Sequence, residues 1–222
     1  MSDLEIIGVP QSNFVRTVRI VCEEKAVSYR LTPGRPRSPE VSAIHPLGKI
    51  PVMRHGEFSL CESKAIATYI DRAFPGPRLF PEDARRCAKI EQWVSIANTV
   101  MIPAINTYLQ CYFFPRTADG QPDRALIDKA APEMRTYVGV CNQAVAQTGH
   151  LVGAEFSYAD MNLLPVVAYL RECPESGEAL NGAKELARYL DRHAERASFK
   201  ATIPPPFSEL RRPAAAARPG NP

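Results

Sequence analysis

The sequence predicts a small α/β domain followed by an all-α, helical bundle domain. In residues 1–80, short apolar runs alternate with helical patterns, whereas beyond residue 80 the apolar residues recur only at spacings of three and four. A stretch rich in proline and glycine, residues 75–81, separates the two parts. The length of 222 residues, with 45% hydrophobic and 23% charged residues, is typical of one or two folded domains. We therefore expect two domains, one formed by residues 1–80 and the other by residues 81–203.

The pattern of the first domain predicts a mixed parallel and antiparallel sheet with helices packed on it. Its predicted elements are, in order, a strand over 4–8, a helix over 13–26, a strand over 28–31, a loop over 32–39, strands over 50–54 and 58–61, and a helix over 63–73. The first strand, helix and strand form a parallel βαβ unit. The short turn at residues 55–57 adds an antiparallel hairpin to it.

In the second domain the hydrophobic pattern predicts four long helical segments, at residues 87–115, 123–149, 158–173 and 179–199. Pro103 and Pro165 lie inside these patterns, so we expect kinks there. Six of the 21 prolines fall within residues 204–222, together with several alanines. We expect these residues to form a mobile tail, because they cannot build a core.

Composition argues against several classes of function. The net charge is only +3 and no polybasic run occurs, so neither nucleic acid nor a membrane is expected as a main partner. No apolar run approaches the ~20 residues of a membrane span, and the N-terminus lacks the basic region of a signal peptide. The six cysteines lie at least 24 residues apart, so no metal-ligand spacing is present. We expect a cytoplasmic protein without a metal.

The first candidate site is the junction between the first strand and helix, at Ser12 and Asn13. Backbone N–H groups at a helix N-terminus favour negative charge, and the Ser12 hydroxyl can donate to an anion. The alternative is a plain helix cap. A serine hydrolase is disfavoured, since no G-x-S-x-G motif surrounds any serine.

The second candidate site is Lys49-Ile50-Pro51, at the start of a predicted strand. A cis bond before Pro51 would leave the backbone N–H and C=O of Ile50 free to pair with an extended peptide. The alternative is an ordinary trans proline at a strand start, with Lys49 as a solvated charge.

The third candidate site is Glu62-Ser63, which opens a helix. The helix N-terminus can bind a carboxylate, and Glu62 can accept from an ammonium group. A structural cap is again the alternative. Together the three sites fit one ligand, with an amino-acid head at Glu62 and Ser63, a peptide bond at Ile50 and a thiol near Ser12.

These motifs resemble those of the cytosolic glutathione transferases. Residues 46–51 place Pro51 at the family's cis-proline position, and residues 62–70 match its Glu-Ser helix start. Residues 8–18 are similar to the serine-type, phi- and zeta-like classes. Residues 153–160 resemble the family's capping segment, where Ser157 and Asp160 have S-x-x-D spacing. The resemblance spans roughly residues 1–200 and implies a thioredoxin-like N-terminal domain.

The resemblance implies a glutathione transferase with glutathione as co-substrate and a homodimer as its assembly. Ser12 would stabilise the glutathione thiolate, a role that Asn13 could share or take over. Glu62 and Ser63 would hold the γ-glutamyl group, Ile50 and Pro51 the cysteinyl backbone, and Lys49 the glycyl carboxylate. The thiolate would attack a small hydrophobic electrophile in the helical domain, near Met101, Ile105, Tyr108, Tyr112 and Phe113. Such residues at helical spacing also suit a core.

The sequence departs from the family at several positions. No tyrosine lies near the first strand and Gln11 precedes Ser12, which argues against tyrosine-type and cysteine-type mechanisms. His45 stands where many members have Asn, and Arg35 and Arg37 match no clear motif for the glycyl end. A non-catalytic binding module, or a glutathione-dependent isomerase or dehalogenase on the same fold, is the alternative function.

Overall fold

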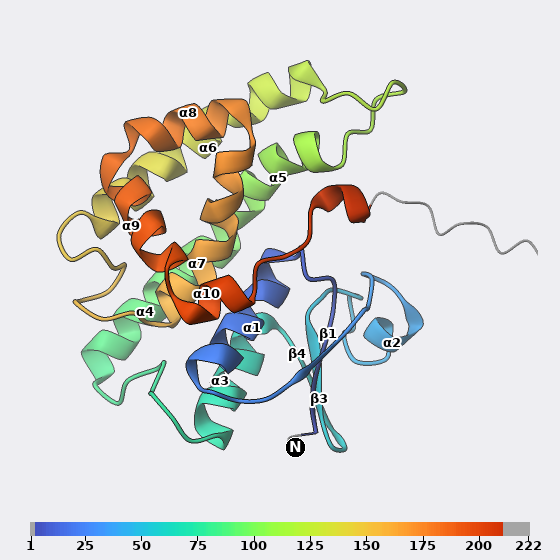
Figure 1. Ribbon diagram of the computed structural model, residues 1–222, viewed down its shortest axis with the longest axis vertical. Coiled ribbons are helices and arrows are strands. Elements are labelled where there is room, and N and C mark those ends of the chain that lie inside the picture. The colour runs from blue at the N-terminus through green and yellow to red at the C-terminus, as the bar shows by residue number, and fades with distance from the viewer. Residues whose placement is uncertain (1–2, 211–222) are drawn as a thin grey trace, which may run out of the picture.

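The computed structural model describes residues 3–210, which form a four-stranded sheet with helices packed on it and a larger helical layer beside them (Figure 1). The strands are β1 (Leu4–Ile7), β2 (Arg30–Thr32), β3 (Val52–His55) and β4 (Phe58–Cys61). Their order is β2-β1-β3-β4, with β1 parallel to β2 and antiparallel to β3. The predicted βαβ unit and hairpin are thus confirmed.

Local chemistry explains the turns of this domain. Gly56 opens the two-residue turn between β3 and β4 with a φ of +57°, a backbone conformation that glycine adopts without steric cost. The short helix α2 (Pro39–Ser42), which the sequence did not predict, begins at the last residue of the predicted loop. Pro39 occupies its first turn, where proline is favoured because its missing N–H has no helical partner. Helix α3 (Ser63–Ala73) has the predicted bounds.

The helical domain contains more breaks than predicted. Its helices are α4 (Ala84–Ile96), α5 (Ile102–Phe113), α6 (Arg124–Val145), α7 (Tyr158–Tyr169), α8 (Pro174–Gly182), α9 (Lys184–Ala194) and α10 (Ala197–Ala201). Two 3₁₀ turns, η2 (Leu170–Glu172) and η3 (Phe207–Glu209), complete it. Within residues 3–210, no helix is long and apolar enough to cross a membrane.

A π-helical turn, η1 (Ala97–Met101), separates α4 from α5. Pro103 follows it and cannot donate a hydrogen bond to the carbonyl of Thr99. Such widened turns form where the regular hydrogen-bond ladder is interrupted, and they occur often at functional sites. The interruption that Pro103 predicts is therefore present, as a widened turn rather than a bend alone.

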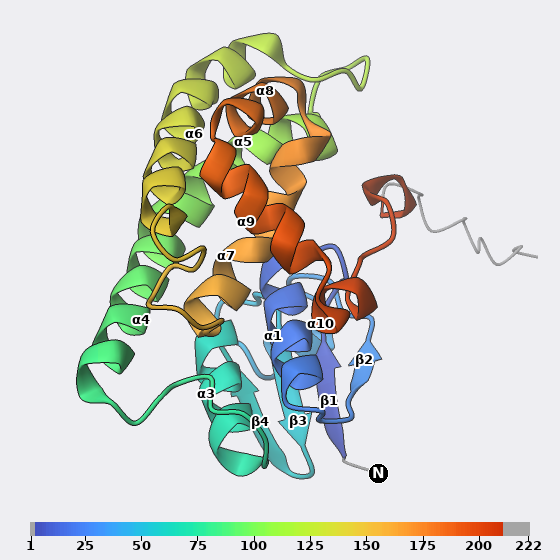
Figure 2. The same ribbon diagram turned by 60° about the vertical axis from the view of Figure 1, so that its left-hand side comes forward.

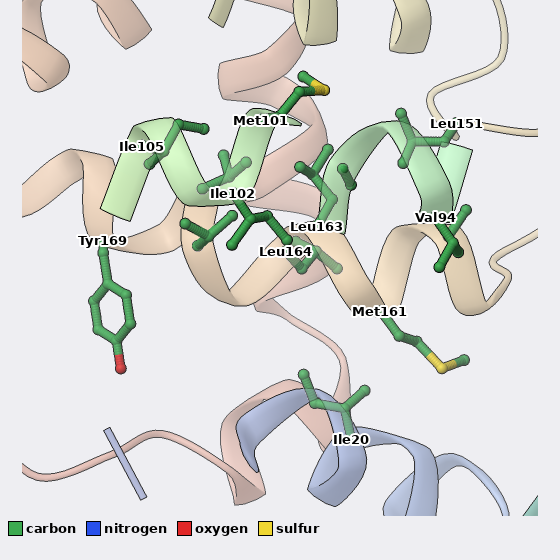
Figure 3. Packing of buried hydrophobic residues seen from close by; sticks show 14 of the residues in the cluster. Ile20, Val94, Met101, Ile102, Ile105, Leu151, Met161, Leu163, Leu164 and Tyr169 are labelled. Atoms are coloured by element: carbon green, nitrogen blue, oxygen red, sulfur yellow. The ribbon is translucent and has the colours of Figure 1, made fainter. Parts of the chain in front are cut away.

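Helix α1 (Asn13–Glu24) lies between the sheet and the helical layer (Figure 2). It packs against β1, α3, α7 and α10. Val15, Val18 and Ile20 are fully buried, in a hydrophobic cluster that continues into the second domain. Figure 3 shows Ile20 facing α7, with α5 on the far side of that helix. The two domains therefore share one core.

The predicted capping box of α7 is confirmed. The Ser157 N–H donates to the Asp160 carboxylate at 3.0 Å, and the Leu151 N–H donates to it at 2.9 Å. Tyr189 adds a hydroxyl donor at 3.2 Å. Asp160 is fully buried, so these partners replace the water that a carboxylate otherwise needs.

The linker between α3 and α4 is held by a buried ion pair. Lys25 Nζ lies 3.2 Å from Asp71 Oδ1, with 0% and 2% of the two side chains exposed. Lys25 also donates to the Pro77 carbonyl at 3.0 Å, and the Leu79 N–H donates to Asp71 at 2.9 Å. The pair thus fastens the linker to the C-terminal ends of α1 and α3.

Replacing Asp71 by alanine should lower the free energy of unfolding by about 3–5 kcal/mol, because the Lys25 amine would be left buried without its carboxylate partner. Urea denaturation measures this change. The matched control is Glu195→Ala, which removes an exposed ion pair with Lys200 and should cost under about 1 kcal/mol. Equal effects of the two substitutions would contradict an anchoring role for the buried pair.

Candidate active site between the two domains

Ser12 caps helix α1 and also faces a cavity. Its Oγ accepts from the Val15 N–H at 3.4 Å, which confirms a capping role. A serine hydroxyl has one donor and two acceptor positions, so the cap leaves its proton available to a ligand. Ser12 lines a cavity of about 270 Å³ between the first turn of α1 and helix α5. The cap and the proposed anion donor are therefore compatible.

Asn13 and Tyr169 line the same cavity. Asn13 is 9% exposed, and its Nδ2 has no hydrogen-bond partner among the described residues. Tyr169 on α7 donates its hydroxyl to the Gln11 carbonyl at 2.8 Å. This bond ties the helical domain to the loop that precedes Ser12.

The predicted binding residues lie together in a second cavity of about 160 Å³. Its lining contains all five of them and three further side chains: Lys49, Ile50, Pro51, Glu62 and Ser63, with Phe14, His45 and Asn98. Ile50 lines both cavities, so the two adjoin there. The described residues contain no group of three or more His, Cys, Asp or Glu side chains that could hold a metal.

The Ile50–Pro51 bond is cis, as predicted from the sequence. Pro51 is buried and immediately precedes β3. Among the described residues, the backbone N–H and C=O of Ile50 have no hydrogen-bond partner. This backbone can therefore pair with an extended ligand at the edge of the cavity.

Glu62 and Ser63 stand at the N-terminal end of α3. Glu62 has a φ of +69°, a conformation that costs energy for a residue with a Cβ and that clusters at binding sites. Its carboxylate is 69% exposed and available to a cation. Ser63 begins the helix and is buried beside the free N–H groups of its first turn.

His45, which stands where many family members have Asn, lies against Glu62. Its ring is 4% exposed, and its Nε2 lies 3.3 Å from Glu62 Oε1. The other ring nitrogen, Nδ1, accepts from the Leu47 N–H at 3.0 Å, so the neutral ring carries its hydrogen on Nε2. The hydrogen-bearing nitrogen thus faces the carboxylate.

Asn98 is a site residue that the sequence did not suggest. It lies on the π-helical turn η1 and lines the cavity of Glu62 and Ser63. The buried Asn162 on α7 donates to Asn98 Oδ1 at 2.8 Å, which leaves the Asn98 amide hydrogens for another partner. The sequence signal that could have indicated this position is a polar residue, Asn98, shortly before Pro103 in an otherwise apolar helical pattern.

The expected electrophile pocket is corrected by the orientation of α5. Met101, Ile105 and Tyr108 are at most 1% exposed and belong to the core. The cavity wall comes from the neighbouring face of the helix, at Asn106, Leu109, Gln110, Phe113 and Phe114. Of the expected residues, only Phe113 lines the cavity.

Tyr112 and Tyr108 have a structural partner instead. Both donate their hydroxyls to the Glu175 carboxylate, at 2.5 and 2.8 Å. Burial opposes ionisation of Glu175, but hydrogen bonds from Tyr112 and Arg124 lower its pKa to about 2. This cluster joins α5 to α8.

The prediction that residues 204–222 form a mobile tail is wrong for its first seven residues. Residues 204–210 are described and pack against the rest of the protein, and Phe207 and Leu210 line the cavity of Ser12. Aromatic partners on α5 and α7 hold Phe207, which composition alone could not reveal. Residues 211–222 of the predicted tail lie outside the described part.

Comparison with known proteins supplies independent evidence. Residues 6–78 match the model of the glutathione S-transferase N-terminal domain, and residues 99–197 match that of the C-terminal domain. Glutathione S-transferase 3 of Zea mays is 28% identical over 223 residues, which cover 94% of this chain and 99% of the relative.

Solved structures agree with this. Poplar glutathione transferase F1 is similar with a TM-score of 0.81 and 28% identity, over 91% of this chain and 97% of that chain. A glutathione S-transferase of Methylobacillus flagellatus KT with glutathione bound has a TM-score of 0.78 and 26% identity, over 91% and 100% of the two chains. These matches confirm the expected fold, an N-terminal thioredoxin-like domain with a helical second domain, and the expected enzyme class. The chain belongs to the glutathione transferase family.

Proposed function

We propose that the chain binds glutathione across the two adjoining cavities and activates its thiol for attack on a small hydrophobic electrophile. One observation carries the proposal: five residues expected to bind glutathione line one cavity, which meets the cavity of Ser12 at Ile50. The solved Methylobacillus relative with glutathione bound supports the same co-substrate.

Each part of glutathione has a complementary group in this site. The exposed Glu62 carboxylate accepts from the α-ammonium of the γ-glutamyl end, while Ser63 and the α3 N-terminus donate to its α-carboxylate. The unpaired backbone of Ile50 pairs with the cysteinyl residue. Lys49 supplies a cation for the glycyl carboxylate.

Thiolate formation depends on the first turn of α1. A free thiol has a pKa of about 8.5, so most of it stays protonated at neutral pH. The Ser12 hydroxyl and the α1 N-terminus stabilise the charged sulfur, and the thiol proton passes to solvent. The sulfur then forms a bond to the electrophilic carbon, and the displaced electron pair leaves with the leaving group. Asn13 is the second candidate donor, because its amide nitrogen is unpaired beside the cavity.

We further propose a cytoplasmic homodimer. All six cysteines are free thiols, which supports a reducing compartment. Leu47, two residues before Lys49, is 67% exposed, and an open groove runs along α3 from Glu62 to Ala73. An exposed apolar side chain and an open groove both suit an isologous contact between two copies.

The first test of the mechanism compares Ser12→Ala with Asn13→Ala. Loss of the sulfur donor should lower kcat at neutral pH by about tenfold or more for each unit by which the bound thiol's pKa rises, with little change in glutathione affinity. Turnover of 1-chloro-2,4-dinitrobenzene and the pH dependence of thiolate absorbance measure the two quantities. The variant that shifts both identifies the donor.

Loss of the helix cap alone must be separated from loss of the donor. Asp123→Ala removes the cap of α6 in the same way, since Asp123 accepts from the Leu126 N–H, and should cost about 1 kcal/mol of stability without changing kcat. If both Ser12→Ala and Asn13→Ala keep full kcat, neither residue stabilises the thiolate.

Glu62→Ala and Ser63→Ala should each raise the Kd for glutathione by about tenfold or more, because each removes a partner of a charged group. Titration calorimetry measures the affinity, and retention on glutathione resin gives a rapid check. Glu57→Ala, an exposed carboxylate on the β3–β4 turn, is the matched control. Unchanged affinity in both site variants would refute the assignment, and retention without turnover of any electrophile would favour a binding module.

The dimer is tested by light scattering on the purified chain, which should give twice the mass of a single chain. Leu47→Asp should shift the mass toward that of one chain, because a carboxylate buried in the contact would lack a partner. Ile203→Asp, at an equally exposed apolar position away from α3, should leave the mass unchanged. A wild-type chain that elutes as a monomer at all concentrations excludes the proposal.

A further inference from the structure

The last described residues cross from one domain to the other. Residues 203–210, which we term the C-terminal strap, leave α10 beside α1 and end next to α5 (Figures 1 and 2). Two arginines of α1 hold the origin of the strap. Arg19 donates to the carbonyls of Thr202 and Ala201 at 3.2 and 3.3 Å, and Arg16 donates to the Phe199 carbonyl at 3.2 Å.

Aromatic contacts hold the far end of the strap. The ring of Phe207 stacks on Phe113 with centroids 4.0 Å apart and an interplanar angle of 6°. It also meets Tyr169 and Phe114 edge to face, at 5.1 and 5.6 Å. Three consecutive prolines before Phe207 restrict the backbone that delivers this ring. The strap therefore has a defined position over the boundary between the domains.

The strap contributes to the cavity that contains the proposed thiolate donors. Phe207 and Leu210 line it together with Ser12 and Asn13. Beside these apolar side chains are the amides of Asn106 and Gln110 on α5, which also line the cavity. The cavity thus combines aromatic surfaces with amide donors, in about 270 Å³.

We propose that the strap forms a wall of the electrophile site, and that Phe207 makes the enzyme selective for planar aromatic electrophiles. Aromatic rings favour stacked or edge-to-face contacts, which Phe207 and its neighbours offer. The volume is near the lower limit of ligand pockets, ~300 Å³, so it suits a single ring. The inference rests on the proposed function, since it assumes glutathione at Ile50 and Ser12.

Isothiocyanates provide a matched pair of probes. Benzyl and allyl isothiocyanate carry the same reacting group, and only the first has an aromatic ring. In both, the thiolate sulfur forms a bond to the central carbon, the C=N π pair moves to nitrogen, and nitrogen takes a proton from solvent. No leaving group is involved, so a difference between the two reports on recognition of the ring.

The experiment measures kcat/KM for both probes in the wild-type chain, Phe207→Ala, Phe207→Tyr and Phe58→Ala. Phe207→Ala should lower the value for benzyl isothiocyanate by about tenfold and that for allyl isothiocyanate by less than about twofold. Phe207→Tyr should restore the selectivity, because it keeps the ring. Phe58, an exposed ring on β4, is the matched control and should change neither value. The KM for glutathione should stay constant throughout.

Two outcomes overturn the inference: Phe207→Ala lowers both probes equally, or it changes neither. The first assigns the strap a purely structural role, which thermal denaturation of the variant would also show. Calorimetry with S-benzylglutathione and S-methylglutathione gives a readout without turnover, and Phe207→Ala should weaken only the benzyl ligand. If the wild-type chain binds glutathione but Phe207→Ala leaves the benzyl ligand unaffected, only this inference fails. If it binds neither glutathione nor the conjugates, the proposed function fails as well.

Discussion

The burial of α1 is the constraint on which the rest of the structure depends. This helix contacts the sheet, α3, α7 and α10, so almost every face of it must exclude water. Its position fixes the site, because Ser12 and Asn13 form its first turn. It also fixes the end of the chain, because Arg16 and Arg19 hold the residues from which the C-terminal strap departs. One shared helix therefore positions both the proposed thiolate donors and the strap that lines their cavity.

The candidate site offers mainly backbone donors, at two helix N-termini and at Ile50, rather than a cluster of charged side chains. Two helix N-termini, those of α1 and α3, direct backbone N–H groups toward neighbouring cavities, and the Ile50 backbone lies between them. Glutathione carries negative charge at its thiolate and at both carboxylates, so such donors suit it along its length. The buried His45 adds a neutral donor beside Glu62, and this arrangement leaves most of that carboxylate exposed to a cationic ligand group.

The sequence identified the elements of the small domain well, and the five residues that it grouped there line one cavity, because the signals are local. A cis proline, a helix start and a two-residue turn each depend on a few adjacent residues. Prediction was weaker in the helical domain. The apolar pattern of residues 101–113 predicted a helix with an apolar face. It did not show which residues border the cavity, because Met101 and Ile105 recur at the same helical spacing as Leu109 and Phe113. Composition likewise described 204–210 as a tail, although Phe207 finds aromatic partners far away in the sequence.

By itself, the sequence indicated the domain order, the strand and helix types, a candidate cis bond at Pro51 and five residues that share a cavity: Lys49, Ile50, Pro51, Glu62 and Ser63. These follow from hydrophobic period and from backbone chemistry, which act over a few residues. Only the tertiary structure decided which face of α5 meets the cavity of Ser12, that His45 and Asn98 line the cavity of Glu62 and Ser63, and that the C-terminal strap lines the cavity of Ser12. Those outcomes depend on contacts between residues far apart in the chain, where packing and burial select among faces that local patterns leave equivalent.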